Sequence, residues 1–389
     1  MPNKLEMTAD AVVVGGGVMG CSILYNLGAL GMTDTVLLEQ DALGTGSTGS
    51  SQAILRMHYS NEVTTRLAWE SLKVFRDFDE IVGGPSGYVR TGYLLVVGAD
   101  DREALERNVK VQRQAGVTTE VIAPEDAPSV FRVADDEVCA FEPGSGYADA
   151  QSVTQGYAAA ARRLGARVRT REPVSGIRVE RGRVTGVTTG GGEISTPVAV
   201  VAAGPWSGPL LRRVGVEAPL ETVRHQVVTL RRPESALPDH PVLGDVPNSL
   251  SARPDVGYLT LIGVGEEEKV SPGDLDHGVD LAVVEDVAAK LTARMPGMEH
   301  AVFRGGWSGL FTTTPDWHPI LARVSEVEGL YCAVGFSGHG FKLAPMVGVV
   351  MAELVMQGEA TTIDVSMLGL DRFAEGRLMQ SRYKMSVLA

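Results

Sequence analysis

The sequence predicts a mixed α/β protein in which a domain built on a parallel sheet is interleaved with a second, α+β domain. Three observations predict it. A strand–turn–helix–strand unit occupies residues 11–39, and continuous apolar strands recur near residues 197–204 and 329–334. The segments between them alternate short strands with amphipathic helices. At 389 residues the chain also exceeds what a single core usually sustains, so we expect two domains.

The first unit carries a glycine pattern. Gly15, Gly17 and Gly20 follow an apolar strand in G-x-G-x-x-G spacing, and Glu39 ends the next strand. Gly15 permits a tight turn, Gly17 lets the backbone approach a pyrophosphate, and Gly20 lets helix and strand pack closely. The helix N-terminus then presents free N–H groups to phosphate, and the carboxylate can accept from a ribose hydroxyl. Because strand, helix and acid occur in order, we favour a dinucleotide site over a structural glycine turn.

Composition argues against several function classes. A net charge of −13 argues against nucleic acid as a partner, and no apolar run approaches the roughly 18 residues that span a bilayer. Residues 1–10 lack the apolar core of a secretory signal, so we expect a cytoplasmic protein with no membrane partner. The seven histidines form no ligand-spaced pair, so we expect no metal site. We interpret Cys21, Cys139 and Cys332 as structural thiols.

Residues 44–52, directly after Glu39, are dense in glycine and small hydroxyl residues. Such a segment is typical of a flexible loop, but its place after the ribose acid favours a second backbone cradle for a long cofactor. Arg56 follows it. Apolar residues then recur at helical spacing from residue 60 until Gly83 ends the pattern. We expect the first stretch of the cofactor domain to end at residue 85.

Residues 86–145 begin the second domain. We expect a strand at 92–97 and a polar amphipathic helix at 101–116, with Leu105 and Val109 facing inward.

A helix from about residue 150 to residue 165 marks a return to the first domain. Asp149 is its expected N-cap. Its expected core-facing residues are Val153, Tyr157, Ala161 and Leu164. Short strands follow near Val168, at 174–179 and at 184–187, before the apolar strand that ends at Gly204, where a glycine suits close approach to a ligand.

The remaining chain repeats this alternation. Strands at 223–230 and 258–262 and a helix at 280–294 again have the character of the second domain. We therefore assign residues 1–85, 146–217 and 301–389 to the cofactor domain and residues 86–145 and 218–300 to a substrate domain.

The last segment assigned to the cofactor domain contains a second informative group of residues. A strand at 329–334 leads into the glycine-rich loop 335–342, which ends in Lys342, and an apolar helix follows at 343–356. The helix N-terminus would carry about half a positive charge toward whatever the loop contacts, and an anionic reduced flavin is a good candidate. A tight turn with a surface lysine is the alternative.

Together these motifs resemble the D-amino-acid oxidase family of FAD enzymes, and within it the sarcosine oxidase and dimethylglycine dehydrogenase branch. The resemblance covers nearly the whole chain. It is carried by Gly15–Gly20 with Glu39, residues 46–51 with Arg56, the strand 200–204, residues 314–319 and residues 335–342. It implies a Rossmann-like FAD-binding domain interleaved with a substrate domain built on an antiparallel sheet.

The resemblance also implies site residues. Those that would bind FAD are Gly15, Gly17, Val18, Met19, Gly20, Glu39, Gln40, Ser47, Thr48, Ser50, Ser51, Gln52, Val174, Ala203, Gly204, Trp206, Gly338, His339, Gly340, Phe341 and Lys342. Arg56 and Lys342 would be the catalytic pair that holds a substrate carboxylate, with Lys342 also assisting oxygen activation. The alternative for Arg56 is an ion pair with Glu62. His225 and His339 are further candidates for substrate binding.

Two departures from the family matter. The segment 307–310 lacks the cysteine that links FAD covalently in monomeric sarcosine oxidases, so we expect non-covalent FAD. The strand region 258–268 lacks the family's active-site histidine, which argues against sarcosine itself. His225 and Gln226 lie on a neighbouring strand, but adjacent strand residues face opposite sides, so at most one of them can point into the cavity.

The expected activity is oxidation of a C–N bond in an amino acid or secondary amine. A neutral amine passes hydride from its α-carbon to flavin N5, the imine is hydrolysed, and oxygen reoxidises the flavin with release of peroxide. The cofactor carries the redox chemistry, so no catalytic triad is required. Alternatives are a 2-hydroxy-acid or glycerol-phosphate oxidoreductase, a subunit of a multi-chain amine dehydrogenase, or a flavin-binding protein without turnover.

Overall fold

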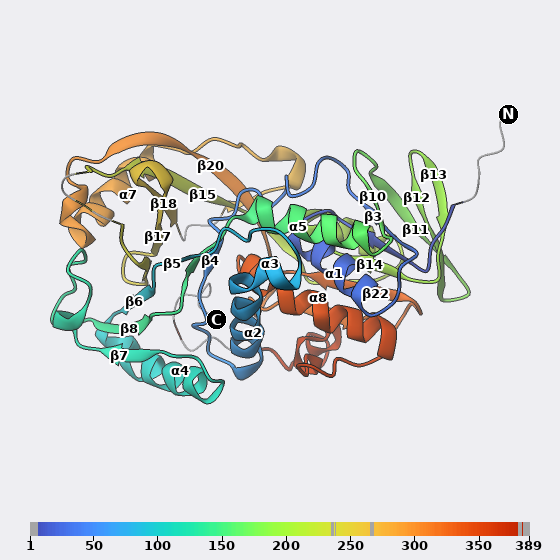
Figure 1. The fold of residues 1–389 in the computed structure, drawn as a ribbon, viewed down its shortest axis with the longest axis horizontal. Helices are drawn as coiled ribbons and strands as arrows, with labels where there is room; N and C mark the ends of the chain where they lie inside the picture. Colours follow the sequence, from blue (N-terminus) through green and yellow to red (C-terminus); the bar gives the residue numbers. More distant parts are fainter. Residues whose placement is uncertain (1–6, 235–236, 238, 265–267, 380–382, 384–389) are drawn as a thin grey trace.

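The computed structural model describes residues 7–234, 237, 239–264, 268–379 and 383, and in this part of the chain two large sheets lie side by side (Figure 1). Residues 1–6 and 265–267 lie outside the described residues. Parts of the expectations about the N-terminus and about the region 258–268 rest on them.

The six-stranded sheet holds the predicted strand–turn–helix–strand unit. Its strands, in spatial order, are β10 (Arg167–Arg169), β3 (Thr35–Leu38), β2 (Ala11–Val14), β14 (Ala199–Val201), β22 (Leu330–Val334) and β21 (Ile320–Arg323). All neighbours are parallel except β21, which runs antiparallel to β22. Strands far apart in sequence therefore end at one edge, where ligands bind in open α/β sheets.

The nine-stranded sheet forms the other half. Its path is β19 (Glu268–Lys269), β15 (Glu221–Arg231), β18 (Leu259–Val264), β17 (Leu250–Asp255), β16 (Val242–Asp245), β6 (Tyr93–Val97), β8 (Val138–Glu142) and β7 (Glu120–Ile122), with β20 (Val302–Thr313) paired to β15. It is antiparallel apart from the β16–β6 pair. This confirms an α/β fold that combines a parallel sheet with a largely antiparallel one.

Two smaller sheets complete the strands. One joins β1 (Met7–Thr8), β13 (Gly192–Ser195), β12 (Arg183–Thr189) and β11 (Val174–Glu180), and the other joins β4 (Ile54–Leu55), β9 (Gly146–Tyr147) and β5 (Val89–Arg90).

Helices cover the sheets. They are α1 (Val18–Ala29), α2 (Glu62–Arg76), α3 (Phe78–Ile81), α4 (Arg102–Gln114), α5 (Ala150–Arg163), α6 (Ser207–Arg212), α7 (Leu281–Arg294) and α8 (Gly340–Gln357). Asn61 caps α2 and Asp149 caps α5, each accepting a backbone N–H with its side chain.

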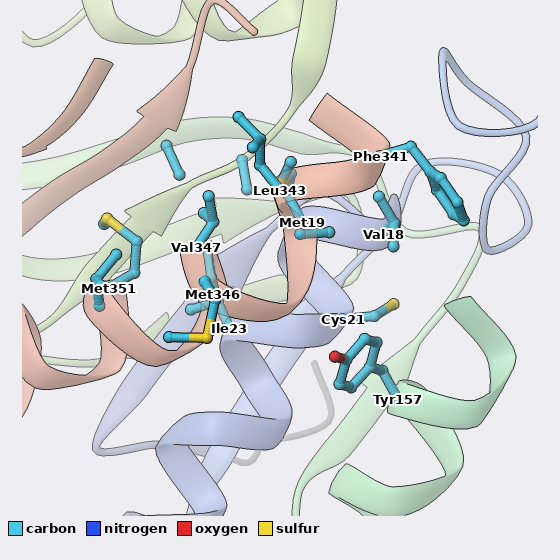
Figure 2. Packing of buried hydrophobic residues seen from close by; sticks show 14 of the residues in the cluster. Val18, Met19, Cys21, Ile23, Tyr157, Phe341, Leu343, Met346, Val347 and Met351 are labelled. Carbon is cyan, nitrogen blue, oxygen red and sulfur yellow. The ribbon is translucent and has the colours of Figure 1, made fainter. Parts of the chain in front are cut away.

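The largest core cluster lies where α1, α5 and α8 meet. Figure 2 shows Met346 and Val347 of α8 close to Ile23 of α1, with Tyr157 of α5 near Cys21. The α1–α8 crossing is tight because a Cβ atom on Gly348 would lie 2.1 Å from Ser22 Oγ. This packing fixes the N-termini of α1 and α8 relative to each other.

Against the expectation that no apolar run approaches the length of a membrane span, helix α8 is long and apolar enough to cross one, with a mean hydropathy of 1.3 over 18 residues. It is 67% buried inside the fold, against α1 and α2, as a core helix is.

The structure corrects three expectations. Residues 302–313, which we placed with the cofactor domain, form β20 and pair with β15, because strand pairing depends on a partner 70 or more residues away. Helix α8 begins at Gly340, so Lys342 lies in its first turn and not in the preceding loop. Leu164 is 36% exposed, because it follows the last residue of α5 and no longer lies on that helix's buried face.

Candidate active site

A cavity of about 430 Å³ lies along the carboxyl edge of the six-stranded sheet. The residues on its wall that the sequence predicted for a cofactor are Gly15, Gly17, Val18, Met19, Glu39, Gln40, Ser47, Thr48, Ser50, Ser51, Val174, Ala203, Gly204, Trp206, Gly338, Gly340 and Phe341. The glycine turn, the hydroxyl-rich segment and the closing loop therefore meet around one space.

The glycine turn opens the N-terminus of α1 onto this cavity. Gly15 has φ of +112°, and a Cβ atom on it would lie 2.3 Å from the Ala202 carbonyl oxygen. Gly17 is the N-cap of α1 and supplies no side-chain cap. A Cβ atom on Gly17 would meet only Thr48 Oγ1, at 3.1 Å, and this hydroxyl also accepts the Val18 N–H at 3.1 Å. The N-terminus of the helix, with its following N–H groups, suits a phosphate.

Glu39 is fixed at the end of β3. Its Oε2 accepts from the Gly16 N–H at 2.6 Å, and its Oε1 accepts from the Asp41 N–H at 2.8 Å. A carboxylate has about four lone-pair sites. Both oxygens therefore retain capacity for ribose hydroxyls, as the dinucleotide pattern predicts.

Gly20 does not line the cavity. A Cβ atom on Gly20 would lie 1.9 Å from the Gly15 carbonyl oxygen. The residue has the packing role that the sequence predicts for the third glycine, and any larger side chain would displace the turn itself.

A second cavity of about 810 Å³ adjoins the first, on the side of the nine-stranded sheet. The two share five lining residues, Ser50, Ser51, Phe311, Gly338 and Phe341. Arg56, Lys342, His225 and Gln52 line only the second. Gln52 donates to the Leu261 carbonyl at 3.0 Å and accepts from Ser251 Oγ at 3.0 Å, and its contact with the cofactor stays a prediction.

Arg56 is held by short-range contacts on its buried side. Its guanidinium donates to the His58 carbonyl, lies 3.5 Å from Nδ1 of His339 and sits 4.7 Å from the centre of the Tyr59 ring. The expected alternative partner, Glu62, lies 4.0 Å from Arg66. The guanidinium is thus fixed at the wall of the second cavity.

His339 does not line either cavity. Its ring contacts Arg56 and lies 5.4 Å from the Tyr59 ring, behind the cavity wall. Burial, with the nearby charges of Arg56 and Lys342, holds the pKa of His339 well below its usual value, so the ring is neutral. Its expected binding of substrate and cofactor stays a prediction, while its ring contacts Arg56.

Lys342 is 7% exposed and lies on the wall of the second cavity. Burial, followed by the charge of Arg56, lowers the pKa of Lys342 well below its usual value. An anion placed between the two groups would restore the ammonium charge.

His225 and Gln226 face opposite sides of β15. His225 lies on the cavity wall and stacks on Phe311, with ring centres 4.3 Å apart. Burial lowers the pKa of His225 to about 4, so its ring is neutral near pH 7. Gln226 points the other way and donates to Asp280 at 2.9 Å.

Sequence reasoning missed Phe311 and Trp317 as site residues. Phe311 lies on β20, which we had assigned away from the substrate domain. Trp317 lies inside the motif 314–319, but no local signal shows which of its side chains faces a cavity.

The three cysteines line neither cavity. Cys21, Cys139 and Cys332 are free thiols and all are buried. Burial raises the pKa of each thiol to about 12. None is therefore placed or ionised for a bond to a cofactor.

Comparison with known proteins agrees with this geometry. A family model described as FAD dependent oxidoreductase, DAO, matches residues 10–354. Human peroxisomal sarcosine oxidase is 30% identical over 367 residues, which cover 90% of this chain and 92% of that protein. The 4-methylaminobutanoate oxidase (formaldehyde-forming) of Paenarthrobacter nicotinovorans is 29% identical over 96% of this chain but only 46% of its own length.

The fold has a solved counterpart. The L-proline dehydrogenase from P. horikoshii superposes with a TM-score of 0.88 at 27% identity, over 96% of this chain and 100% of that one.

Proposed function

We propose that this chain, which belongs to the DAO family of FAD-dependent oxidoreductases, oxidises the C–N bond of an amino acid or secondary amine that carries a carboxylate. The family is one of FAD-dependent oxidoreductases, and we infer that this chain binds FAD and acts as an enzyme. Relatives named for 4-methylaminobutanoate, sarcosine and L-proline support this substrate class.

One observation carries the proposal: Arg56 and Lys342 both lie on the wall of the second cavity, whose lining reaches the first cavity at Gly338 and Phe341. The guanidinium fork suits two carboxylate oxygens, and the lysine adds a compact charge once the anion is present. Their contribution is mainly one of positioning, since they hold the substrate at the junction of the two cavities.

Bound FAD supplies the electron chemistry by accepting a hydride from the substrate carbon next to nitrogen. The first cavity fits it, because the α1 N-terminus and Glu39 offer the pyrophosphate and ribose contacts that a dinucleotide needs. The protein's own residues bind, orient and exclude water.

His225 offers a neutral ring to the amine. A Cβ atom on Gly263, which also lines the cavity, would lie 3.0 Å from Nε2 of His225, so this nitrogen lies close to the wall. A neutral imidazole nitrogen can accept an N–H of the substrate. We infer that His225 orients the substrate nitrogen by taking this hydrogen bond.

We infer that oxygen is the electron acceptor and that Lys342 favours its reaction through its positive charge. We also infer that the six-stranded sheet carries FAD and the nine-stranded sheet carries substrate, with the last boundary after Thr313 and not at residue 301. FAD is proposed to bind without a covalent link. A cytoplasmic location stays a prediction, since a relative is named as peroxisomal.

The test is anaerobic addition of candidate substrates to the purified yellow protein, followed by flavin absorbance. We expect bleaching by at least one carboxylate-bearing amino acid or secondary amine, and recovery with peroxide release on admission of air. Bleaching by 2-hydroxy acids or glycerol phosphate alone would contradict the proposal.

The chain spans less than half the length of the first curated relatives it matches. The activity of the single chain is therefore itself part of the proposal. Turnover of an amine by the purified chain alone supports it, and turnover only after another protein is added would assign the chain as one subunit of a larger dehydrogenase.

A further inference from the structure

Trp317 has an unusual backbone for a bulky residue. Its φ is +60°, in the left-handed region that favours glycine, and its side chain lies on the wall of the second cavity. A bulky residue remains in this region only where its surroundings determine it. Both of its neighbours in the chain are buried and bonded.

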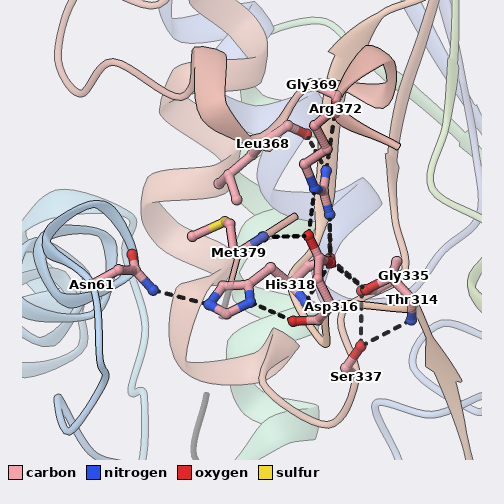
Figure 3. Close-up of polar contacts among 10 residues, drawn as sticks. All are labelled: Asn61, Thr314, Asp316, His318, Gly335, Ser337, Leu368, Gly369, Arg372 and Met379. Atoms are coloured by element: carbon pink, nitrogen blue, oxygen red, sulfur yellow. Dashed lines mark hydrogen bonds and ion pairs between the residues drawn. The ribbon is translucent and has the colours of Figure 1, made fainter. Parts of the chain in front are cut away.

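Asp316, on one side, forms an ion pair with Arg372 in which both side chains are fully buried. Arg372 Nε donates to Asp316 Oδ2 at 2.8 Å, and its Nη2 donates to Asp316 Oδ1 at 3.0 Å and to the His318 carbonyl at 2.9 Å (Figure 3). One arginine thus holds both ends of the three-residue turn around Trp317.

His318, on the other side, is fixed by its ring. Nδ2 of Asn61 lies 2.9 Å from Nε2 of His318. The side-chain oxygen Oδ1 of Asn61 already accepts the Thr64 N–H as the cap of α2, so the side-chain nitrogen faces His318 and donates. Nε2 therefore accepts, and Nδ1 donates to the Asp316 carbonyl at 2.7 Å. The turn is anchored to the start of α2, five residues after Arg56.

The turn is also tied to the closing loop. The Thr314 N–H donates to Ser337 Oγ at 3.3 Å (Figure 3). Ser337 precedes Gly338 in the chain, and Gly338 lines both cavities. Trp317, between two neighbours that are fixed in this way, has the left-handed conformation and lines the second cavity.

From this arrangement we propose that Trp317 determines substrate specificity by limiting the width of the group that a carboxylate-anchored substrate carries beyond its anchor. The inference rests on the proposed function for the anchor at Arg56 and Lys342. A flat indole on a rigid turn excludes wide groups and leaves small ones unaffected, which is discrimination by the size of the substrate.

The experiment uses unreactive carboxylates of increasing width: acetate, benzoate and 1-naphthoate. Their dissociation constants are measured from perturbation of the flavin absorbance in the holoenzyme, in wild type, Trp317→Phe and Trp317→Ala. We expect Trp317→Ala to tighten 1-naphthoate by about tenfold or more with little change for acetate, and Trp317→Phe to fall between. A parallel change for all three probes, or no change, would overturn the inference.

A second variant separates the effect of the Trp317 side chain on the cavity wall from the effect of its strained backbone. Trp317→Gly removes the same side chain but suits a φ of +60°, whereas Trp317→Ala keeps the strain. Both variants should change the dissociation constants of the three probes in the same way, with a higher Tm for Trp317→Gly. If the dissociation constants followed Tm and not the size of the side chain, Trp317 would have a structural role only. If wild type bound none of the probes, the anchor and the inference would both fail, whereas normal binding without a shift would overturn the inference alone.

Discussion

Nη2 of Arg56 lies 3.5 Å from Nδ1 of His339, and this contact fixes the protonation of the histidine. An arginine can only donate, so Nδ1 accepts and Nε2 carries the proton. The two residues come from segments 283 positions apart, the first after the hydroxyl-rich cradle and the second at the start of α8. Their contact therefore couples the proposed substrate anchor to the loop at the junction of the cavities.

His339→Phe should weaken carboxylate binding without removing it. The ring contact with Tyr59 remains, but Arg56 loses an acceptor that holds its guanidinium. Since a hydrogen bond to a charged group is worth about 1.5–3 kcal/mol and this one is long, we expect a loss of about tenfold. Benzoate titration of the holoenzyme measures it, with His240→Phe, at a buried histidine that lines neither cavity, as the control. Equal effects of the two substitutions would contradict a positioning role.

Gly17→Val should abolish FAD binding. The new side chain would fill the space between the α1 N-terminus and Thr48 where we place the pyrophosphate. Gly176→Val is the matched control, because Gly176 lies in β11 with open space around its Cβ position. Flavin content per purified chain is the measurement. Normal flavin content in Gly17→Val would remove the basis of the cofactor assignment.

Acid or heat precipitation should release all of the flavin. The expected position of a linking cysteine is occupied by residues 307–310, and the three cysteines are buried away from both cavities. The measurement is flavin absorbance of the supernatant and of the washed pellet. A yellow pellet would show a covalent bond and reverse this prediction.

The features that sequence analysis predicted well are local. Gly15, Gly17 and Glu39 belong to one short strand–turn–helix–strand unit, so their spacing in sequence specifies their positions in space. Lys342 lines a cavity for the same reason, since it lies in the first turn of α8, within a few residues of the end of β22. The packing of α1 against α8 then brings these two local units together.

The features that it missed depend on distant partners. Phe311 reaches the cavity because β20 pairs with β15, and the apolar pattern of β20 does not show which sheet it joins. Trp317 faces the cavity because Arg372, 55 residues later, holds the turn around it. His339 was assigned to substrate from the glycine loop, but its ring turns toward Arg56.

Asp316→Asn should destabilise the protein strongly. It leaves Arg372 charged and buried without its partner, which costs about 3–5 kcal/mol for a fully buried pair. Adding Arg372→Met should recover much of this loss, since both charges are then absent. The free energy of unfolding from urea titration measures both effects. Equal loss in the single and double variants would show that the pair does not act as a unit.

The ion pair between Asp316 and Arg372 also predicts how the free energy of unfolding depends on pH in the acid range. Burial alone would raise the pKa of Asp316, but the hydrogen bonds and charge of Arg372 leave it below the usual value. A depressed pKa contributes stability that is present above the unfolded value of about 3.9 and is lost as pH falls through the folded value. The gap in unfolding free energy between wild type and Asp316→Asn should therefore narrow below about pH 3.9. A gap independent of pH would contradict the ion pair.

Lys342→Met should change both carboxylate binding and the reaction with oxygen. In the free site, burial and the charge of Arg56 keep the pKa of Lys342 well below its usual value. A bound carboxylate raises that pKa, so binding takes up a proton, and affinity should fall as pH rises above the pKa of the free site. Benzoate titration across pH measures this dependence, which Lys342→Met should remove together with part of the affinity.

The reaction with oxygen tests the second role of Lys342. A preorganised charge beside developing negative charge is commonly worth about 100-fold or more in rate, so reduced Lys342→Met enzyme should react with oxygen about that much more slowly. Stopped-flow mixing of photoreduced enzyme with oxygen, without substrate and across pH, measures it, because the lowered pKa of Lys342 in the free site leaves its charge present only below that pKa. Lys290→Met, on α7 and paired with Asp286, is the control and should match wild type. An unchanged oxygen rate with weakened benzoate binding would leave Lys342 as an anchor only and favour an acceptor other than oxygen. If neither quantity changed, Lys342 would not face the reacting groups, and the active site would have to lie elsewhere than at the junction of the two cavities.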